Sequence, residues 1–149
     1  MSHKTCAIAT LAVLSLAACG GGASGGGNTV TVREARAACN GGVDHVEVRD
    51  SGIVDRYLGI RRGPSGTHEG FIVSFPARDP SQQGMMSFRL RARIEDNIDI
   101  TGRIPLRPGD HVTLQGQLEC NDGVIHWTHH DPSGRHVSGF VDANGRHYQ

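Results

Sequence analysis

Residues 86–94 alternate strictly between apolar and polar side chains, and no other stretch limits the possible folds so strongly. Because successive residues of a β-strand point to opposite faces, this pattern predicts a strand with one buried face. Looser alternation with frequent turn residues runs from residue 43 to the end. We therefore predict an all-β domain. The apolar face of the predicted strand consists of Met86, Phe88, Leu90, Ala92 and Ile94.

Turn residues divide this part of the sequence into five or six strands. Residues 61–66, rich in Gly and Pro, are a predicted loop, and the N-D-G sequence at residues 121–123 predicts a tight hairpin. The first strand is long and is expected to bend at residues 50–52. With no helices between the strands, this pattern predicts a small OB-like barrel, and a small β-sandwich is the alternative. The predicted strands cover residues 43–58, 68–75, 86–94, 111–120 and 124–128, followed by a short hairpin around 142–145.

One short helix is predicted before the strands, at residues 29–39. Thr29 is the candidate N-cap, and the N-G-G sequence at residues 40–42 is expected to end the helix. Helix and strands together make one predicted domain over residues 29–149, which is long enough for a single core.

Residues 1–18 have the pattern of an export signal. Lys4 supplies a positive charge, and the apolar run at residues 6–16 is too short for a permanent membrane span. The L-A-A-C sequence at residues 16–19 resembles the lipobox of bacterial lipoproteins, which implies cleavage after residue 18 and lipidation of Cys19. An ordinary secretory signal cut at the same place is the alternative.

A glycine-rich segment follows the predicted lipid site. Residues 19–28 are expected to form a flexible tether between the lipid on Cys19 and the domain. Gly20 stands where Asp would favour retention at the inner membrane, so resemblance to enterobacterial sorting rules favours the outer membrane, facing the periplasm. The expected partners are the membrane, through the lipid, and an unknown ligand or protein of the cell envelope.

The predicted mature chain is nearly neutral. The 15 basic residues of the whole chain include Lys4, so removing residues 1–18 leaves 14 basic against 15 acidic residues. Arg89, Arg91 and Arg93 lie on the polar face of the predicted strand, but few aromatic residues are present to stack on bases. We interpret this arginine row as a solvated face and expect no nucleic-acid partner.

Cys39 and Cys120 are the two cysteines outside the export signal and the lipid site. In an oxidising envelope compartment, two such thiols predict one disulfide that joins the start of the domain to its late part. Two free buried thiols are the alternative.

A histidine-rich segment marks the candidate site, since five of the nine histidines lie between residues 126 and 147. Imidazoles beside the carboxylate of Asp131 suggest Zn²⁺ or another divalent metal as a possible cofactor. On a strand, however, His126 and His130 would lie about 13 Å apart, too far to share an ion. Chelation would then need a turn of the chain at His129, or ligands from elsewhere, for which the candidates are His68, Asp99 and His136.

An interpretation without a metal explains the same segment. Ile125 and Trp127 would fill the barrel, while the histidines would face water or bind loop backbone groups. The sequence contains none of the common nucleophile, phosphate-loop or zinc-protease motifs.

These motifs resemble an uncharacterised family of small bacterial envelope proteins, the domain-of-unknown-function 3465 family. The strongest match is G-V-I-H-W-T-H-H-D-P at residues 123–132, followed by Gly134, His136 and Gly139. The H-E-G-F-I-V sequence at residues 68–73 resembles the family's H-Q-R-F-I-V. The resemblance covers roughly residues 43–149. Further matches are the N-I-D, P-L and G-D sequences at 97–99, 105–106 and 109–110, and the ending at 145–149.

The sequence departs from the family's pattern at two positions. Asp96 stands where a histidine is expected before N-I-D, which weakens any site that requires an imidazole there. Cys120 stands where an aromatic residue is commoner, so the predicted disulfide would be particular to this chain. The resemblance implies no established activity, but it suggests one polar cluster. With Asp131 and His136 from the histidine-rich segment, its candidate residues are His68, Asn97, Asp99, His126, His129 and His130.

Our leading hypothesis from the sequence is a lipid-anchored, non-enzymatic OB-like domain that binds a ligand or partner in the envelope through this polar cluster. The alternatives are a metal-dependent hydrolase, perhaps acting on phosphodiesters, and a metal-binding lipoprotein.

Overall fold

A computed structural model describes residues 28–77 and 88–149 of the chain. The export signal, Cys19, almost all of the tether and the start of the predicted strand at Met86 lie outside the described residues. Within the described part, no helix is long and apolar enough to cross a membrane. The helices are α1 (Val32–Asn40) and α2 (Ile98–Thr101), and the strands are β1 (His45–Gly63), β2 (Gly66–Ala77), β3 (Phe88–Asn97), β4 (His111–Glu119), β5 (Val124–His126), β6 (Phe140–Ala143) and β7 (Arg146–Tyr148).

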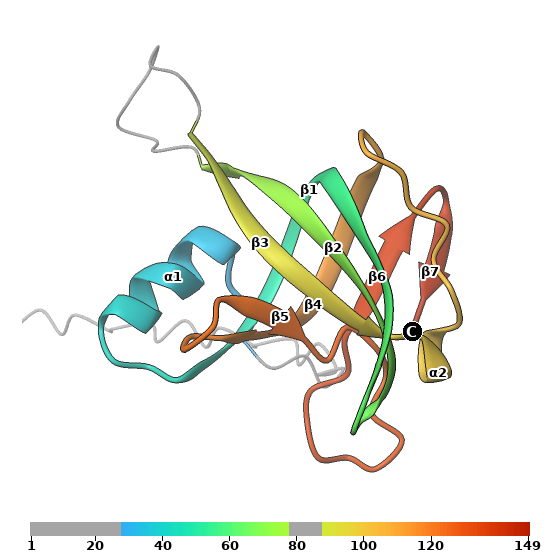
Figure 1. The fold of residues 1–149 in the computed structure, drawn as a ribbon. Coiled ribbons are helices and arrows are strands. Elements are labelled where there is room, and N and C mark those ends of the chain that lie inside the picture. The colour runs from blue at the N-terminus through green and yellow to red at the C-terminus, as the bar shows by residue number, and fades with distance from the viewer. Residues whose placement is uncertain (1–27, 78–87) are drawn as a thin grey trace, which may run out of the picture.

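Five of the strands form a closed ring within a single seven-stranded sheet (Figure 1). β1 pairs with β2, β2 with β3, β3 with β5, β5 with β4, and β4 again with β1. The β3–β5 pairing is parallel and the others are antiparallel. The β6–β7 hairpin extends the sheet from the edge of β4. The predicted all-β, OB-like fold class is confirmed.

β1 is bent because it changes partner along its length. Residues up to Ile53 pair with β4, and residues from Ile53 onward pair with β2. A Cβ atom on the buried Gly52 would lie 2.5 Å from the carbonyl oxygen of Ser74, so only glycine permits this close approach of β2. The bend therefore lies close to the predicted one. The bulges, however, occur further along, next to Asp55 and Leu58.

The predicted loop at residues 61–66 is wrong. Arg61 to Gly63 continue β1 and pair with the start of β2, so only Pro64 and Ser65 form the turn. Strand pairing uses backbone groups, which the polar side chains of this stretch leave free. Gly66 has a φ of 124°, which glycine adopts without strain, and this conformation closes the hairpin.

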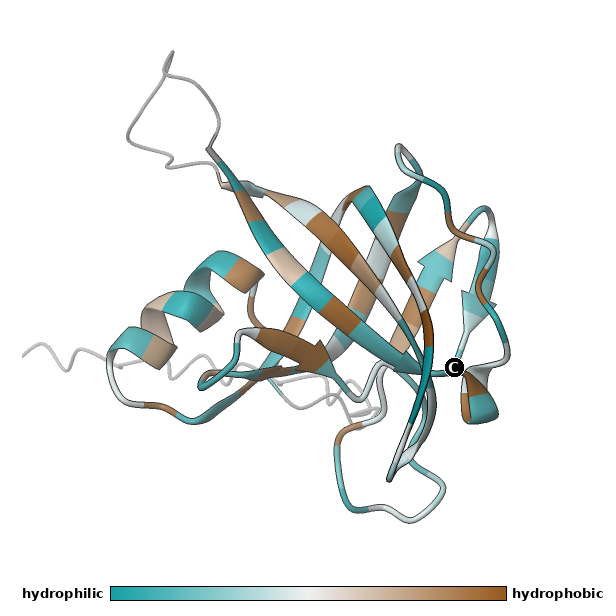
Figure 2. Cartoon of the chain, in the orientation of Figure 1, coloured by the Kyte–Doolittle hydropathy of each residue, from teal (hydrophilic) through white to brown (hydrophobic). Residues whose placement is uncertain are grey.

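The core fills the interior of the ring and continues under α1. Val32 and Ala35 of α1 are fully buried and join it. Figure 2 shows the apolar residues alternating with polar ones along β3, as the sequence pattern predicts. The largest fully buried apolar side chains of the strands are Phe71, Phe75, Ile94, Leu114, Leu118 and Ile125.

α1 begins three residues later than predicted, and its N-cap is Thr31 instead of Thr29. The Thr31 hydroxyl accepts a hydrogen bond from the backbone N–H of Glu34, and the Glu34 carboxylate accepts one from the N–H of Thr31 at 2.9 Å. This reciprocal capping box satisfies two N–H groups that the helix leaves free. Thr29 could supply only the hydroxyl of such a cap, because Val32, three residues later, has no carboxylate to complete a capping box. The end of the helix at Gly41 agrees with the prediction.

Replacing Thr31 with Ala should therefore lower the free energy of unfolding by about 1 kcal/mol, because the cap hydroxyl is lost. Urea unfolding followed by circular dichroism measures this change. Thr29→Ala is the matched control and should change stability little. Equal losses in the two variants would contradict the assignment of the cap.

The Cys39–Cys120 disulfide is present and links the last turn of α1 to the end of β4. The two Cα atoms lie 5.4 Å apart, within the range of natural disulfides. This predicted pairing is confirmed. It fixes the helix against the sheet at one end of the ring.

Candidate functional site

The segment between β5 and β6, residues 127–139, is a long loop that folds back beside the β1–β2 hairpin (Figure 1). β5 ends at His126 because Trp127 has a φ of 58°, in the left-handed region that bulky residues rarely adopt. This conformation breaks the alternation that the sequence suggests. Ile125 is fully buried as predicted, but Trp127 is 39% exposed instead of filling the interior.

The close packing of Gly139 against the backbone of Trp127 supports this conformation. A Cβ atom at position 139 would lie 2.0 Å from the carbonyl oxygen of Trp127 and 2.4 Å from that of Gln115. The backbone N–H of Gly139 also donates to the carbonyl of His129 at 2.8 Å. The start and end of the loop are thus pressed together against β4.

The Asp131 carboxylate organises the loop, and both of its oxygens accept hydrogen bonds from the loop itself. One oxygen accepts hydrogen bonds from the backbone N–H and the hydroxyl of Ser133, at 2.8 and 2.7 Å, and the other accepts from the N–H of His136 at 2.6 Å. Desolvation opposes ionisation, but these bonds outweigh it and hold the pKa of Asp131 well below its usual range. Asp131 therefore acts as a permanent structural anion.

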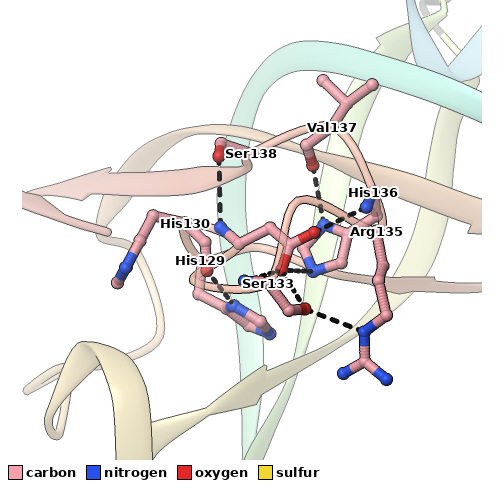
Figure 3. Close-up of polar contacts among 8 residues, drawn as sticks. His129, His130, Ser133, Arg135, His136, Val137 and Ser138 are labelled. Carbon is pink, nitrogen blue, oxygen red and sulfur yellow. Dashed lines mark hydrogen bonds and ion pairs between the residues drawn. The ribbon is translucent and has the colours of Figure 1, made fainter.

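Two histidines of the loop, His129 and His136, point toward one another (Figure 3). In each, Nδ1 lies within hydrogen-bonding distance of the next residue's carbonyl oxygen, at 2.7 Å for His129 and 2.8 Å for His136. A carbonyl can only accept, so Nδ1 of each ring is the donor in these hydrogen bonds. The His136 ring also stacks on the Trp127 indole, with ring centroids 4.3 Å apart.

These residues line a cavity of about 660 Å³ on the outer face of the sheet. Six of the eight predicted cluster residues contribute to its wall, namely His68, Asn97, His126, His129, Asp131 and His136. The other two do not. His130 is exposed and its side chain points away from the cluster (Figure 3). The other residues that line the cavity are Ser65, Glu95, Ile100, Glu119, Trp127, Pro132, Ser133 and Arg135.

Asp99 supports the wall of the cavity from outside. Its carboxylate accepts a hydrogen bond from the backbone N–H of Thr67 at 2.8 Å. Asn97 donates from its side-chain amide to the carbonyl of Ser65 at 3.3 Å. Together they fasten the β1–β2 hairpin to the end of β3. Asp99, a candidate ligand from the sequence, is thus absent from the cavity wall and holds the hairpin in place.

Glu95 and His126 form the wall where β3 and β5 run side by side. The Glu95 carboxylate is almost fully buried and pairs with Arg61 at 3.1 Å and with Arg93. Burial lowers the pKa of the His126 imidazole, although nearby carboxylates, including Glu95, oppose this effect. His126 is consequently neutral at pH 7, with one donor and one acceptor.

Two carboxylic acids lie inside the ring, behind the cavity. Glu69 on β2 and Asp96 on β3 are opposite each other and fully buried. Burial raises the pKa of both carboxyls against the hydrogen bonds that they accept, which come from Ile104 N–H at 2.7 Å for Glu69 and from Thr128 at 2.8 Å for Asp96. Position 96, where the family's histidine was expected, thus faces the interior and does not line the cavity.

Asp96→Asn should stabilise the protein at neutral and alkaline pH. Because the folded-state pKa is raised, the contribution of Asp96 to stability is fully present below the unfolded-state pKa and is lost as pH rises through the folded-state value. Asparagine avoids this loss and can still bond Thr128. Thermal melts from pH 4 to 8 should show a gain of a few degrees that grows with pH. Asp44→Asn, at an exposed carboxyl, is the control, and a gain independent of pH would contradict this explanation.

The described residues do not form a ready metal-binding site. Among residues 28–77 and 88–149, no three His, Cys, Asp or Glu side chains lie close enough together to hold an ion. The chain does turn, at Trp127 and not at His129 as chelation would require, and the turn brings His129 to His136. It turns His130 away, however, and Asp131 is committed to the loop.

The arginine row lies on the outer face of β3, as predicted. Arg91 is 73% exposed and pairs with Asp55 at 2.7 Å, and Arg93 pairs with Glu95. Two of the three positive charges thus have partners within the described sheet, which fits a solvated face.

Comparison with known proteins identifies the family of the chain. The family described as "Protein of unknown function (DUF3465)" matches residues 45–149. The chain belongs to this family. Its matched region contains the five-strand ring and every residue of the cavity, whereas α1 and Cys39 lie before it. No curated protein and no solved structure gives a significant match.

Sequence reasoning missed three features of the site. Glu95 was not singled out, although a lone acid after the row of arginines on the same strand face is a detectable signal. The exposure of Trp127 depends on a left-handed backbone, for which Gly139, twelve residues later, gives the only sign. From the sequence, Asp96 was interpreted as the loss of a family histidine. Its place in the structure follows instead from its pairing with Glu69 on the neighbouring strand.

Proposed function

We propose that the protein is a lipid-anchored binding module of the bacterial cell envelope that holds a small polar ligand, or one unit of a polymer, against Trp127. The lipobox-like sequence ending at Cys19 supports export and lipidation. The outer face of strands 2 and 3 is where OB-like proteins commonly bind ligands, and the cavity lies beside it.

The observation that carries the proposal is the conformation of Trp127. A large aromatic side chain sits at the cavity, 39% exposed, on a strained left-handed backbone. Such strain persists only where the surrounding structure enforces it, and it is concentrated at functional positions. Here Gly139 and the bonds of Asp131 enforce it. An indole presented in this way offers a flat apolar surface for a ligand ring.

Binding is favoured over hydrolysis because, of the described serine hydroxyls that line the cavity, only that of Ser133 bonds a carboxylate, and this bond belongs to the fold of the loop. The Ser133 hydroxyl donates to Asp131 and accepts from Arg135 at 2.8 Å, so it is fixed within the loop. The described residues also offer no three converging metal ligands. The alternatives of a metal-dependent hydrolase and a metal store therefore lack the geometry that each requires.

The single tryptophan of the chain makes the binding proposal testable. The full-length protein carrying Cys19→Ser, labelled with ¹⁵N, should give one indole N–H signal, from Trp127. We expect that at least one of three probe classes (saccharides, nucleosides or aromatic amino acids) shifts this signal saturably. No shift with any class at millimolar concentration would contradict the proposal.

Lipid anchoring requires a separate experiment. Cells grown with an alkyne-labelled palmitate should incorporate the label into the wild-type protein and not into Cys19→Ser, which should also be lost from the membrane fraction. Cys39→Ser is the matched control and should retain the label. Equal labelling of wild type and Cys19→Ser would exclude lipidation at that residue.

A further inference from the structure

A second cavity, of about 380 Å³, adjoins the first at the tip of the β1–β2 hairpin. The two share four wall residues, Ser65, His68, Glu95 and His126. They therefore adjoin at these residues, and together they are called the groove, which extends from the loop at Trp127 to the hairpin. The hairpin end is completed by Arg61, Arg62, Gly63 and Pro64.

The hairpin end of the groove is positively charged. Glu95 is its one acidic wall residue, and its carboxylate already binds two guanidinium groups, those of Arg61 and Arg93. The Arg61 side chain remains 62% exposed, so it keeps donors available. Arg62 is exposed and has no ion-pair partner among the described residues. An anionic group of a ligand would find unsatisfied guanidinium donors here.

The middle of the groove is polar, and its one carboxylate, that of Glu95, is neutralised by Arg61 and Arg93. Neutral His126 offers one donor and one acceptor, His68 adds a second imidazole, and the Asn97 amide keeps one hydrogen beyond its bond to Ser65. Hydroxyl groups also donate and accept, so this wall matches a polyhydroxylated ligand. A pyranose ring, in addition, carries C–H groups on its face, which pack against an indole such as that of Trp127.

We propose that the groove binds an acidic saccharide, with a sugar ring against Trp127, hydroxyl groups at the imidazoles and a carboxylate at Arg61 and Arg62. This inference rests on the proposed function and names its ligand class. A nucleic acid fits less well. Trp127 is the one tryptophan at the groove, whereas single strands use successive aromatic platforms, and Glu119 and Asp131 line the same wall.

The test pairs each charged sugar with its neutral equivalent. The Cys19→Ser protein is titrated calorimetrically with oligosaccharides containing uronic acid, sialic acid or muramic acid, and with the methyl ester of each. We expect at least one acid to bind more tightly than its ester, by about fivefold for one exposed ion pair. Arg62→Gln should remove that preference, and Trp127→Ala should weaken acid and ester alike.

Arg89→Gln, on exposed β3 outside the groove, is the matched control and should leave the preference intact. Esters that bind as tightly as the acids would overturn the anionic inference, while their binding would still support a site at Trp127. If no saccharide binds, or if an octathymidylate binds more tightly than every sugar, the saccharide inference is overturned. The nucleoside and amino-acid probes of the indole experiment then decide the proposed function independently.

Discussion

Loss of the Cys39–Cys120 disulfide is expected to lower the free energy of unfolding by about 4 kcal/mol. The bond closes a loop of 81 residues of sequence separation, so it restricts the unfolded chain strongly. In the folded state it joins α1 to the end of β4. α1 contributes Val32 and Ala35 to the core and is otherwise held mainly by its contacts with β1.

The measurement is urea unfolding of the Cys19→Ser protein and of the variant that also carries Cys39→Ala and Cys120→Ala. The midpoint of thermal unfolding should fall by roughly 15 °C. Treating the parent with a reductant should reproduce most of the loss, whereas the double-alanine variant should not respond to the reductant. A loss below about 1 kcal/mol would mean that the denatured chain gains little freedom when the bond is absent.

The strands were predictable because their signal is local. Alternation on β3 and the turn residues between β4 and β5 depend on neighbours in sequence, and the structure follows both. The hairpin tip was not predictable in the same way. Arg61 is polar and Gly63 has no side chain, which is typical of loops. Their backbones nevertheless pair with β2, because pairing depends on the partner strand and not on their own polarity.

The site was predictable in membership more than in roles. The histidine-rich segment pointed to His126, His129 and His136, and the structure places all three at one cavity. Roles depend on contacts between distant segments. Asp99 fastens Thr67 of another strand, and Asp131 binds backbone groups that face it only after the loop has folded. Neither arrangement has a periodic signal in the sequence.

Gly139→Ala should produce the second large effect, a loss of about 3 kcal/mol together with disruption of the site. The new methyl carbon would lie 2.0 Å from the carbonyl oxygen of Trp127, 2.4 Å from that of Gln115 and 2.9 Å from the Cα of Thr128. All three are backbone atoms, so no side-chain rotation relieves the clash. The loop must then move away from β4, which breaks the hydrogen bond from Gly139 to His129.

Because Trp127 is held in place by this contact, the same substitution separates stability from site geometry. Urea unfolding gives the loss of stability, and the indole signal and fluorescence of Trp127 should show a change of environment even in the folded variant. Gly63→Ala is the control, since a Cβ atom there meets nothing closer than 3.9 Å and should alter neither quantity much. An unchanged indole signal in Gly139→Ala would mean that Trp127 adopts its left-handed conformation without this support. In that case the bonds accepted by the Asp131 carboxylate would be the loop's main restraint. Asp131→Asn, which weakens them, should then be the more disruptive change.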